Sequence, residues 1–302
     1  EYDREMFQNV GMDLEKFPAI HTGCEIAGRL TEEAAYHLGL RAGIPVSVGG
    51  GDGACANVGA GVVEPGHFYL SLGTTAWIAG PMEKPFLDPQ HRVFHIYTMD
   101  GHGCNVFGTM QCAGRSISWA QELLGYNSPR AMDAAAETVA PGAGGLIYLP
   151  YLEGERSPVF DAKARGVFFG MNTMHKKEHF ARAVLEGTGC GLAQILSAFR
   201  EREPIESLRI IGGGAKSKLW KQIIADLCDV RLLEVSTFSD SATSMGAAAA
   251  AGVGIGLFPD LASAVAHIQT TGGTEPQEHP EYALTKKRYG MLYPSLVDVF
   301  RT

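Results

Sequence analysis

Short apolar runs that end in glycine-rich turns recur along the chain and predict the strands of an α/β protein. A β-branched run over residues 44–48 ends in three glycines and Asp52, and a second run over residues 68–72 ends in Gly73. Glycine suits such tight turns because it has no side chain to restrict its backbone angles. Both segments are therefore predicted to be strands followed by sharp turns. Further strands are predicted over residues 92–98 and 146–149.

Apolar residues at helical spacing predict a long helix over residues 178–201. The segment 241–252 is rich in alanine, so its helix has a small face that suits close packing on a neighbour. Strands that alternate with helices in this way indicate an α/β fold. The predicted elements after residue 201 are strand 207–211, helix 218–228, strand 231–235, helix 241–252 and helix 282–299.

Composition excludes several classes of protein. Hydrophobic residues make up 45% and charged residues 19% of the chain, which excludes a disordered protein, and no run approaches the roughly 18 apolar residues of a membrane span. The net charge of -8, without a long run of Lys or Arg, argues against nucleic acid or an anionic membrane as the main partner. The six cysteines show neither zinc-site nor disulfide spacing, so a reducing cytoplasm is the expected location.

Asp52 is the first candidate for chemistry. It follows a predicted strand and three glycines, so its carboxylate is expected at the C-terminal end of that strand, where open α/β sheets place their ligands. A general base suits this position. The alternative is a cap for a short helix over residues 53–58, and position alone leaves both interpretations open.

Two glycine turns are candidates for binding phosphate or ribose. The turn 73–75 combines backbone N–H groups with hydroxyls, although an ordinary hairpin turn is the simpler interpretation of that segment alone. The turn 212–217 lies between a strand and a helix, where backbone can approach an anion closely. It also fits the start of a dinucleotide fingerprint, with Glu234 about twenty residues further on. Two details weaken that alternative: Ser217 stands where glycine or alanine should pack helix on strand, and the unit comes late in the chain rather than at the start of a domain.

Two further segments carry weaker signals. Gly114 lies where residues 108–119 run from a predicted strand into a helix, and it is placed for another close backbone approach. The loop 153–158 concentrates charge, for which an internal ion-pair network is favoured over a substrate-facing loop. His175 and His179 are four residues apart, but they flank two lysines, which favours a solvated helix start over a metal site, so no metal-ligating residue is predicted.

Taken together, these turns resemble the FGGY family of carbohydrate kinases, and the resemblance covers nearly the whole chain. The run 166–171, followed after seven residues by 179–186, is similar to the second signature of the family in residue type and spacing. The motifs that also occur in the order of the family are Gly-Gly-Gly-Asp52, Ser-Leu-Gly73-Thr74, Glu-Arg-Ser-Pro158 and Gly-Gly-Gly-Ala-Lys-Ser217.

The resemblance implies two actin-like lobes of ribonuclease H type, with sugar held mainly by the first lobe and ATP mainly by the second. Residues 1–42 resemble the end of the first, sugar-binding lobe, and residues 43–302 resemble the second, ATP-binding lobe. The phosphate loop that opens the first lobe in the family has no counterpart in this chain, which also lacks an initiator Met. We therefore expect a part of a longer kinase that cannot transfer phosphate alone.

The resemblance also implies a role for each candidate residue. Asp52 would be the catalytic base that takes a proton from the sugar hydroxyl, and Mg²⁺ would bridge the phosphates of ATP. Ser118 and Lys218 differ from the residues that some family members have at these positions. The residues expected to bind the nucleotide are Gly73 and Thr74 at the β- and γ-phosphates, and Gly114, Ser118, Gly213, Gly214, Ala215 and Lys218 around the rest of it.

The sequence is most similar to the xylulose-kinase branch, which implies a transferase that converts D-xylulose to D-xylulose 5-phosphate. Gluconate kinases share the Asp-Gly pair and the Gly-Glu-Arg-Ser-Pro loop, so they remain the alternative. A non-catalytic actin-like module and a dehydrogenase that depends on Glu234 also remain open. A small sugar is the expected partner; relatives are commonly homodimers, and the sequence leaves the oligomeric state open.

Overall fold

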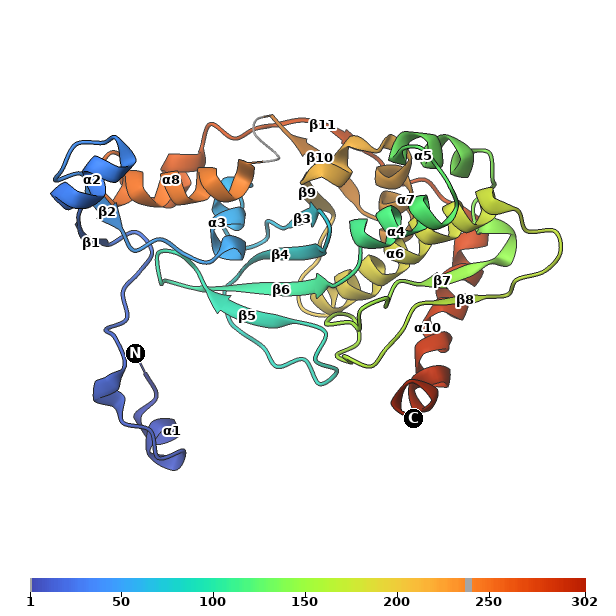
Figure 1. Cartoon of the computed structure of the whole chain (residues 1–302), viewed down its shortest axis with the longest axis horizontal. Helices are drawn as coiled ribbons and strands as arrows, with labels where there is room; N and C mark the ends of the chain where they lie inside the picture. The colour runs from blue at the N-terminus through green and yellow to red at the C-terminus, as the bar shows by residue number, and fades with distance from the viewer. Residues whose placement is uncertain (1, 237–240) are drawn as a thin grey trace.

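The computed structural model describes residues 2–236 and 241–302. Within these residues, the largest sheet has seven strands in the order β11-β10-β9-β3-β4-β6-β5 (Figure 1). The strands of this sheet are β3 (Tyr69–Leu72), β4 (Ala76–Met82), β5 (Phe94–Tyr97), β6 (Cys104–Met110), β9 (Ser207–Ile211), β10 (Arg231–Val235) and β11 (Thr270–Thr274).

The sheet is mixed: β3, β9 and β10 run parallel to one another, and the other neighbouring strands pair antiparallel. β4 pairs antiparallel with both β3 and β6, whereas β9 pairs parallel with both β3 and β10. In the central parallel pair, Tyr69 is opposite Arg209 and Ser71 is opposite Ile211. Since β3 and β9 run in the same direction, the turns that follow them lie at the same edge of the sheet.

Side chains of β3 alternate between the two faces of the sheet, as the period of a strand requires. Leu70 and Leu72 belong to the large core that includes the long helix α6 (Lys177–Arg200) and the helix α7 (Lys218–Cys228). Tyr69 belongs to a smaller core with α3 (Asp52–Gly59) on the other face. The sheet is therefore covered by helices on both faces, which explains why all four residues of β3 are buried.

Helices α3 and α8 (Ala242–Gly254) approach each other closely because glycine stands at their contact. A Cβ on Gly246 would overlap the Cys55 carbonyl oxygen, and a Cβ on Gly59 would overlap the Ala242 carbonyl oxygen. The expectation of a small-faced helix over residues 241–252 is confirmed. Figure 1 shows α3 beside α8, and this contact positions α3, whose first residue is Asp52.

Two predicted strands lie outside the main sheet. The run 44–48 forms β2 (Pro45–Ser47), which pairs with β1 (Ile26–Arg29) in a separate two-stranded sheet. The run is therefore a strand, as predicted, and the residues of β2 are largely exposed. The run 146–149 forms β7 (Ile147–Leu149), which is buried and pairs with β8 (Val167–Phe169).

The other predicted elements are confirmed with small shifts at their ends, and several elements were not predicted. The last helix is longer than expected, and none of the helices among the described residues is long and apolar enough to cross a membrane. The remaining helices are α1 (Arg4–Asn9), α2 (Glu32–Leu38), α4 (Gly114–Leu123), α5 (Pro129–Glu137), α9 (Leu261–Val265) and α10 (Pro280–Arg301), with 3-10 turns over Leu14–Lys16, Ala143–Gly145 and Gly213–Lys216.

Replacing Gly246 with Ala is expected to destabilise the fold by about 1–3 kcal/mol, because the added methyl group overlaps α3. Alanine is otherwise favoured over glycine inside a helix, so the sign of the effect reports the contact itself. Urea unfolding measures the change. Gly272→Ala is the control, since no atom lies within 4 Å of its added Cβ. Equal stability of the two variants would contradict the close contact.

Candidate functional site

The turn 73–75 joins β3 to β4 as a β-hairpin. The Gly73 N–H donates a hydrogen bond to the Thr75 carbonyl oxygen at 2.9 Å, so the hairpin interpretation describes its local geometry correctly. Gly73 is half-buried and Thr74 is exposed. The turn therefore presents backbone and a hydroxyl group at the end of β3, which is where the sequence predicted a phosphate site.

The N-terminus of α4 binds this turn through three backbone hydrogen bonds, which we call the α4–hairpin contact. The N–H groups of Ala113 and Arg115 donate to the Thr74 carbonyl oxygen at 3.2 and 3.0 Å, and that of Gly114 donates to the Gly73 carbonyl oxygen at 3.0 Å. A Cβ on Gly114 would lie 2.5 Å from that Gly73 oxygen, so only glycine allows the approach. Two candidate segments far apart in sequence thus form one unit.

Ser118 is exposed and lies four residues after Gly114 in α4. Residues at this spacing share one face of a helix, so both lie on the same side of α4. The structure therefore brings Gly73, Thr74, Gly114 and Ser118 together, as the predicted nucleotide site requires.

The turn after β9 continues as the 3-10 segment Gly213–Lys216 and then as α7. Ser217 caps α7, because its hydroxyl accepts a hydrogen bond from the Trp220 N–H at 3.1 Å. The same hydroxyl donates to the Asp133 carboxylate at 2.6 Å, and burial raises the pKa of Asp133. This contact fixes the start of α7 against α5.

Four predicted residues in this turn differ in exposure. Gly213 and Lys218 are exposed, and no atom lies within 4 Å of a Cβ built on Gly213. A Cβ on Gly214, by contrast, would contact Leu72 and Trp220, and the half-buried Ala215 packs against the large core. Gly213 and Lys218 are therefore open to a ligand, whereas Gly214 and Ala215 support the turn.

The dinucleotide alternative finds no support at Glu234. In a dinucleotide site this carboxylate would bind a ribose, but here it forms an ion pair with Lys221 of α7. Ser217, which stands where that motif has glycine or alanine, caps α7 instead.

Asp52 is the first residue of α3, and it does not cap the helix. The N-cap is Gly51, which offers no side chain, and the Asp52 carboxylate accepts a hydrogen bond from the neighbouring Gly53 N–H at 2.8 Å. The side chain is exposed, so it can reach a substrate. The Tyr69 hydroxyl donates to the Gly53 carbonyl oxygen at 3.4 Å, which links the start of α3 to β3.

The preceding strand does not position Asp52 in the way that was expected. β2 belongs to the separate two-stranded sheet, so Asp52 is not at the C-terminal end of a strand of the main sheet. Instead, helix packing against α8 and the Tyr69 contact place it.

The loop 153–158 lies along β6 and the start of α4, and it forms an internal network. Glu153 makes an ion pair with Arg115 at 2.7 Å on the surface. Glu155 is buried, and its Oε1 accepts hydrogen bonds from the Gln111 N–H at 2.6 Å and the Arg156 N–H at 2.8 Å. The expected internal ion-pair network is therefore not what these residues form: the ion pair lies on the surface, and the buried Glu155 is held by backbone hydrogen bonds.

Sequence reasoning missed the contact of Asp133 with Ser217 and the burial of the Glu155 carboxyl group. Asp133 lies in α5, a helix that was not predicted, although Ser128 as a cap and Pro129 at the first helical position are typical start signals. Glu155 was noted only as one charge in a loop, because nothing in the sequence distinguishes a buried carboxyl group from an exposed one.

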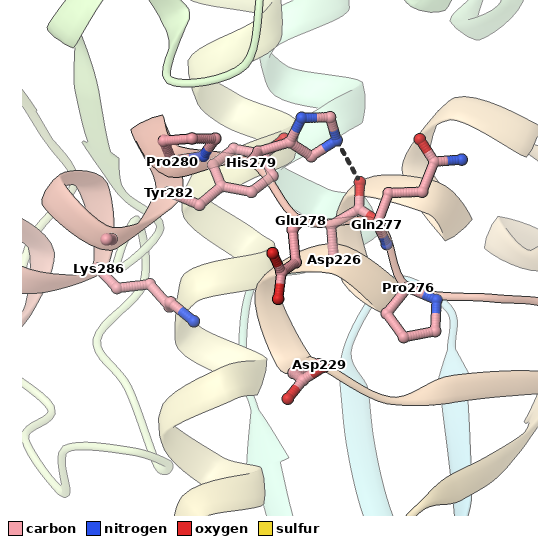
Figure 2. A pocket seen from close by; sticks show the side chains of 10 residues that line it. Asp226, Asp229, Pro276, Gln277, Glu278, His279, Pro280, Tyr282 and Lys286 are labelled. Carbon is pink, nitrogen blue, oxygen red and sulfur yellow. Dashed lines mark hydrogen bonds and ion pairs between the residues drawn. The ribbon is translucent and has the colours of Figure 1, made fainter.

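A pocket of about 360 Å³ lies at the other end of α7, between the end of that helix and the start of α10 (Figure 2). The His279 imidazole lies 3.2 Å from the Asp226 carboxylate in its wall. None of the predicted site residues lines this pocket. Within residues 2–236 and 241–302, no group of three or more His, Cys, Asp or Glu side chains could hold a metal ion.

The chain is similar to known carbohydrate kinases. Residues 68–255 match the FGGY family of carbohydrate kinases, C-terminal domain, and residues 1–59 match the N-terminal domain of that family. A xylulose kinase of Escherichia coli (strain K12) is 32% identical, over 97% of this chain and 61% of that protein. A gluconokinase of Bacillus subtilis (strain 168) is 28% identical, over 80% of this chain and 49% of that protein. The chain thus spans about half the length of the curated relatives it matches.

Solved structures agree with this similarity. A ligand-bound xylulose kinase from Lactobacillus acidophilus has a TM-score of 0.87 and 26% identity, and it covers 100% of this chain and 61% of its own. A gluconate kinase from the same organism has a TM-score of 0.86 and 27% identity, and it covers 99% of this chain and 60% of its own. The α/β, actin-like fold expected from the sequence is confirmed.

Glu155 is expected to make stability depend on pH. Burial raises its pKa from 4.5 to about 8, so the folded state binds more protons than the unfolded state between these values. Between these two values, the free energy of unfolding should therefore fall by about 1.4 kcal/mol for each pH unit. Above about pH 8 it should level off. Urea unfolding of the wild type and of Glu155→Gln from pH 5 to 9 measures the difference.

The control for this series is Glu153→Gln, which removes an exposed carboxylate from the same loop. Its stability should follow the wild type across the range. If the stability of Glu155→Gln changed with pH as that of the wild type does, the claim that the pKa of Glu155 is raised would be wrong.

Proposed function

Because this chain belongs to the FGGY family of carbohydrate kinases, we propose that it forms the ATP-binding part of an enzyme that phosphorylates a sugar hydroxyl. One observation carries the proposal. The turns after β3 and β9 lie at the same edge of the sheet, and the start of α4 binds the first of them. Backbone N–H groups in such turns form concave sites that bind phosphate.

Each residue has a role in the proposed site. Gly73 and Thr74 bind the β- and γ-phosphates, and Gly114 and Ser118 line the nucleotide cleft. Mg²⁺ carried by the phosphates of ATP would supply charge neutralisation at this site. The turn after β9 borders the α-phosphate, ribose and adenine through Gly213, Gly214, Ala215 and Lys218.

Asp52 acts as the general base. Its exposed carboxylate takes the proton from the sugar hydroxyl as the hydroxyl oxygen attacks the γ-phosphorus. The bond between the γ-phosphorus and the bridging oxygen breaks, and ADP leaves. The rest of the rate enhancement comes from placement and charge neutralisation, as is usual in phosphoryl transfer.

We further propose D-xylulose as the sugar, with D-xylulose 5-phosphate as the product. Similarity to a xylulose kinase over 97% of this chain supports the choice. Gluconate is the second candidate, because a gluconokinase matches 80% of the chain at a similar identity. The partner is thus a small sugar, and a homodimer is compatible with the proposal.

The proposal assigns residues 1–42 to the end of a sugar-binding lobe and residues 43–302 to the ATP-binding lobe. This chain alone should then bind nucleotide without transferring phosphate. The matches of residues 1–59 to the N-terminal domain of the family and of residues 68–255 to its C-terminal domain support a division into two parts.

In the full-length enzyme, Asp52→Asn should lower kcat by a factor of about 10²–10⁴, because the amide cannot take the proton. Binding of MgADP should be unchanged, since Asp52 does not contact the nucleotide turns in the proposed site. Release of ADP in the presence of MgATP and D-xylulose measures the rate, and calorimetry measures binding. Asp229→Asn, in the remote pocket, is the matched control. Full activity of Asp52→Asn would exclude it as the base.

The same ADP assay with D-xylulose, gluconate and no sugar distinguishes the candidate functions. A response to D-xylulose alone supports the proposed substrate, and a response to gluconate alone selects the second candidate. If no sugar stimulates ADP release while MgADP still binds, the chain is better described as a non-catalytic nucleotide-binding module.

A further inference from the structure

We propose that Glu155 is a positioning residue for the nucleotide site. Its buried carboxyl group fixes the segment 111–113, which connects β6 to α4, and thereby fixes the α4–hairpin contact at Gly73 and Thr74. The inference rests on the proposed function, because it assumes that nucleotide binds at this turn.

The hydrogen bonds of Glu155 reach the connection directly. The side chain is buried, with 4% of its surface exposed, and its Oε1 lies 2.6 Å from the Gln111 nitrogen. Gln111 directly follows β6 and comes two residues before Ala113, whose N–H binds the Thr74 carbonyl oxygen. One carboxyl oxygen therefore holds the backbone immediately before the α4–hairpin contact.

Other contacts of the same loop cannot replace this one. Ser157 pairs with Thr109 through its backbone and its hydroxyl, both at 3.0 Å, but Thr109 belongs to β6 and is already fixed by the sheet. The ion pair of Glu153 with Arg115 is exposed on both sides, and exposed pairs contribute little to structure. Glu155 provides the buried contact to the connection itself.

The second carboxyl oxygen of Glu155 is buried and has no hydrogen-bond partner among the described residues. A glutamine could accept the same two backbone hydrogen bonds without burying an ionisable group. The hydrogen bonds to Gln111 and Arg156 therefore require the acceptor oxygen, whereas the charge is dispensable for them. Ionisation instead adds charge at the buried second oxygen, which has no partner in the described part of the chain, so the neutral carboxyl group is the form that positions the connection.

Among the described residues, titratable groups from several neighbouring elements interact electrostatically with Glu155. They are Arg156 in the same loop, Cys112 in the β6–α4 connection, Tyr151 after β7 and Tyr289 of α10. Burial raises the pKa of Glu155 to about 8, and the hydrogen bonds from the Gln111 and Arg156 N–H groups, together with the Arg156 charge, oppose this rise more weakly. Above that pH, a buried negative charge appears beside the connection.

Three variants of the full-length enzyme test the proposal: Glu155→Ala, Glu155→Gln and the loop control Glu153→Ala. Glu155→Ala should raise both the KM for MgATP and the Kd for MgADP by about tenfold or more, because misplaced binding groups lose their ligand contacts. At saturating MgATP, kcat should fall much less. Glu155→Gln and Glu153→Ala should stay within about twofold of the wild type.

A pH series provides a second, independent readout. Between pH 7 and 9, the KM for MgATP of the wild type should rise relative to that of Glu155→Gln, since only the wild type acquires the buried charge. This comparison keeps the proposal falsifiable if Glu155→Ala does not fold. Circular dichroism and urea unfolding confirm that each variant is folded.

Folded Glu155→Ala with an unchanged KM and Kd would overturn the proposal and leave only a structural role. Identical pH profiles of the wild type and Glu155→Gln would also overturn it. With either of these results, the proposed function would still hold as long as the wild type binds MgADP. If the wild type neither binds MgADP nor releases ADP with any sugar, both the proposed function and this inference fail.

Discussion

The parallel pairing of β3 with β9 is the constraint on which the rest of the structure depends. It places the hairpin turn after β3 beside the glycine turn after β9, at one edge of the sheet. Buried apolar side chains on both faces hold the pair, with α6 and α7 on one side and α3 on the other. Any shift in the register of β3 against β9 would separate the two turns and divide the proposed nucleotide site.

Helix termini complete the site around this edge. The start of α4 binds the hairpin turn, the start of α7 is fixed by Ser217 and Asp133, and the start of α3 carries Asp52. These helices are positioned by close backbone contacts at glycine and by buried polar groups such as Glu155. Few exposed residues are therefore proposed to contact a ligand, and most of the surrounding residues hold these few in position.

Much of this arrangement could be predicted from the sequence where the local signal and the tertiary environment agree. The segments Ser207–Ile211, Lys218–Cys228 and Arg231–Val235 form the elements that were expected, because their apolar residues face the core in the structure. The run 44–48 forms a strand as expected, but it pairs with β1 outside the main sheet and its residues remain largely exposed, which no local pattern reveals. The joining of Gly73 to Gly114 and the burial of Glu155 depend on contacts distant in sequence, so spacing alone could not predict them.

The central claim is that the turns after β3 and β9 form one nucleotide site together with the start of α4. Hydrogen exchange of the chain with and without MgADP, read by mass spectrometry, tests it most directly. The account predicts slower exchange in segments 73–75, 113–118 and 213–218, and unchanged exchange in the remote pocket around residues 276–286. Slower exchange at that pocket, with none at the three segments, would contradict it.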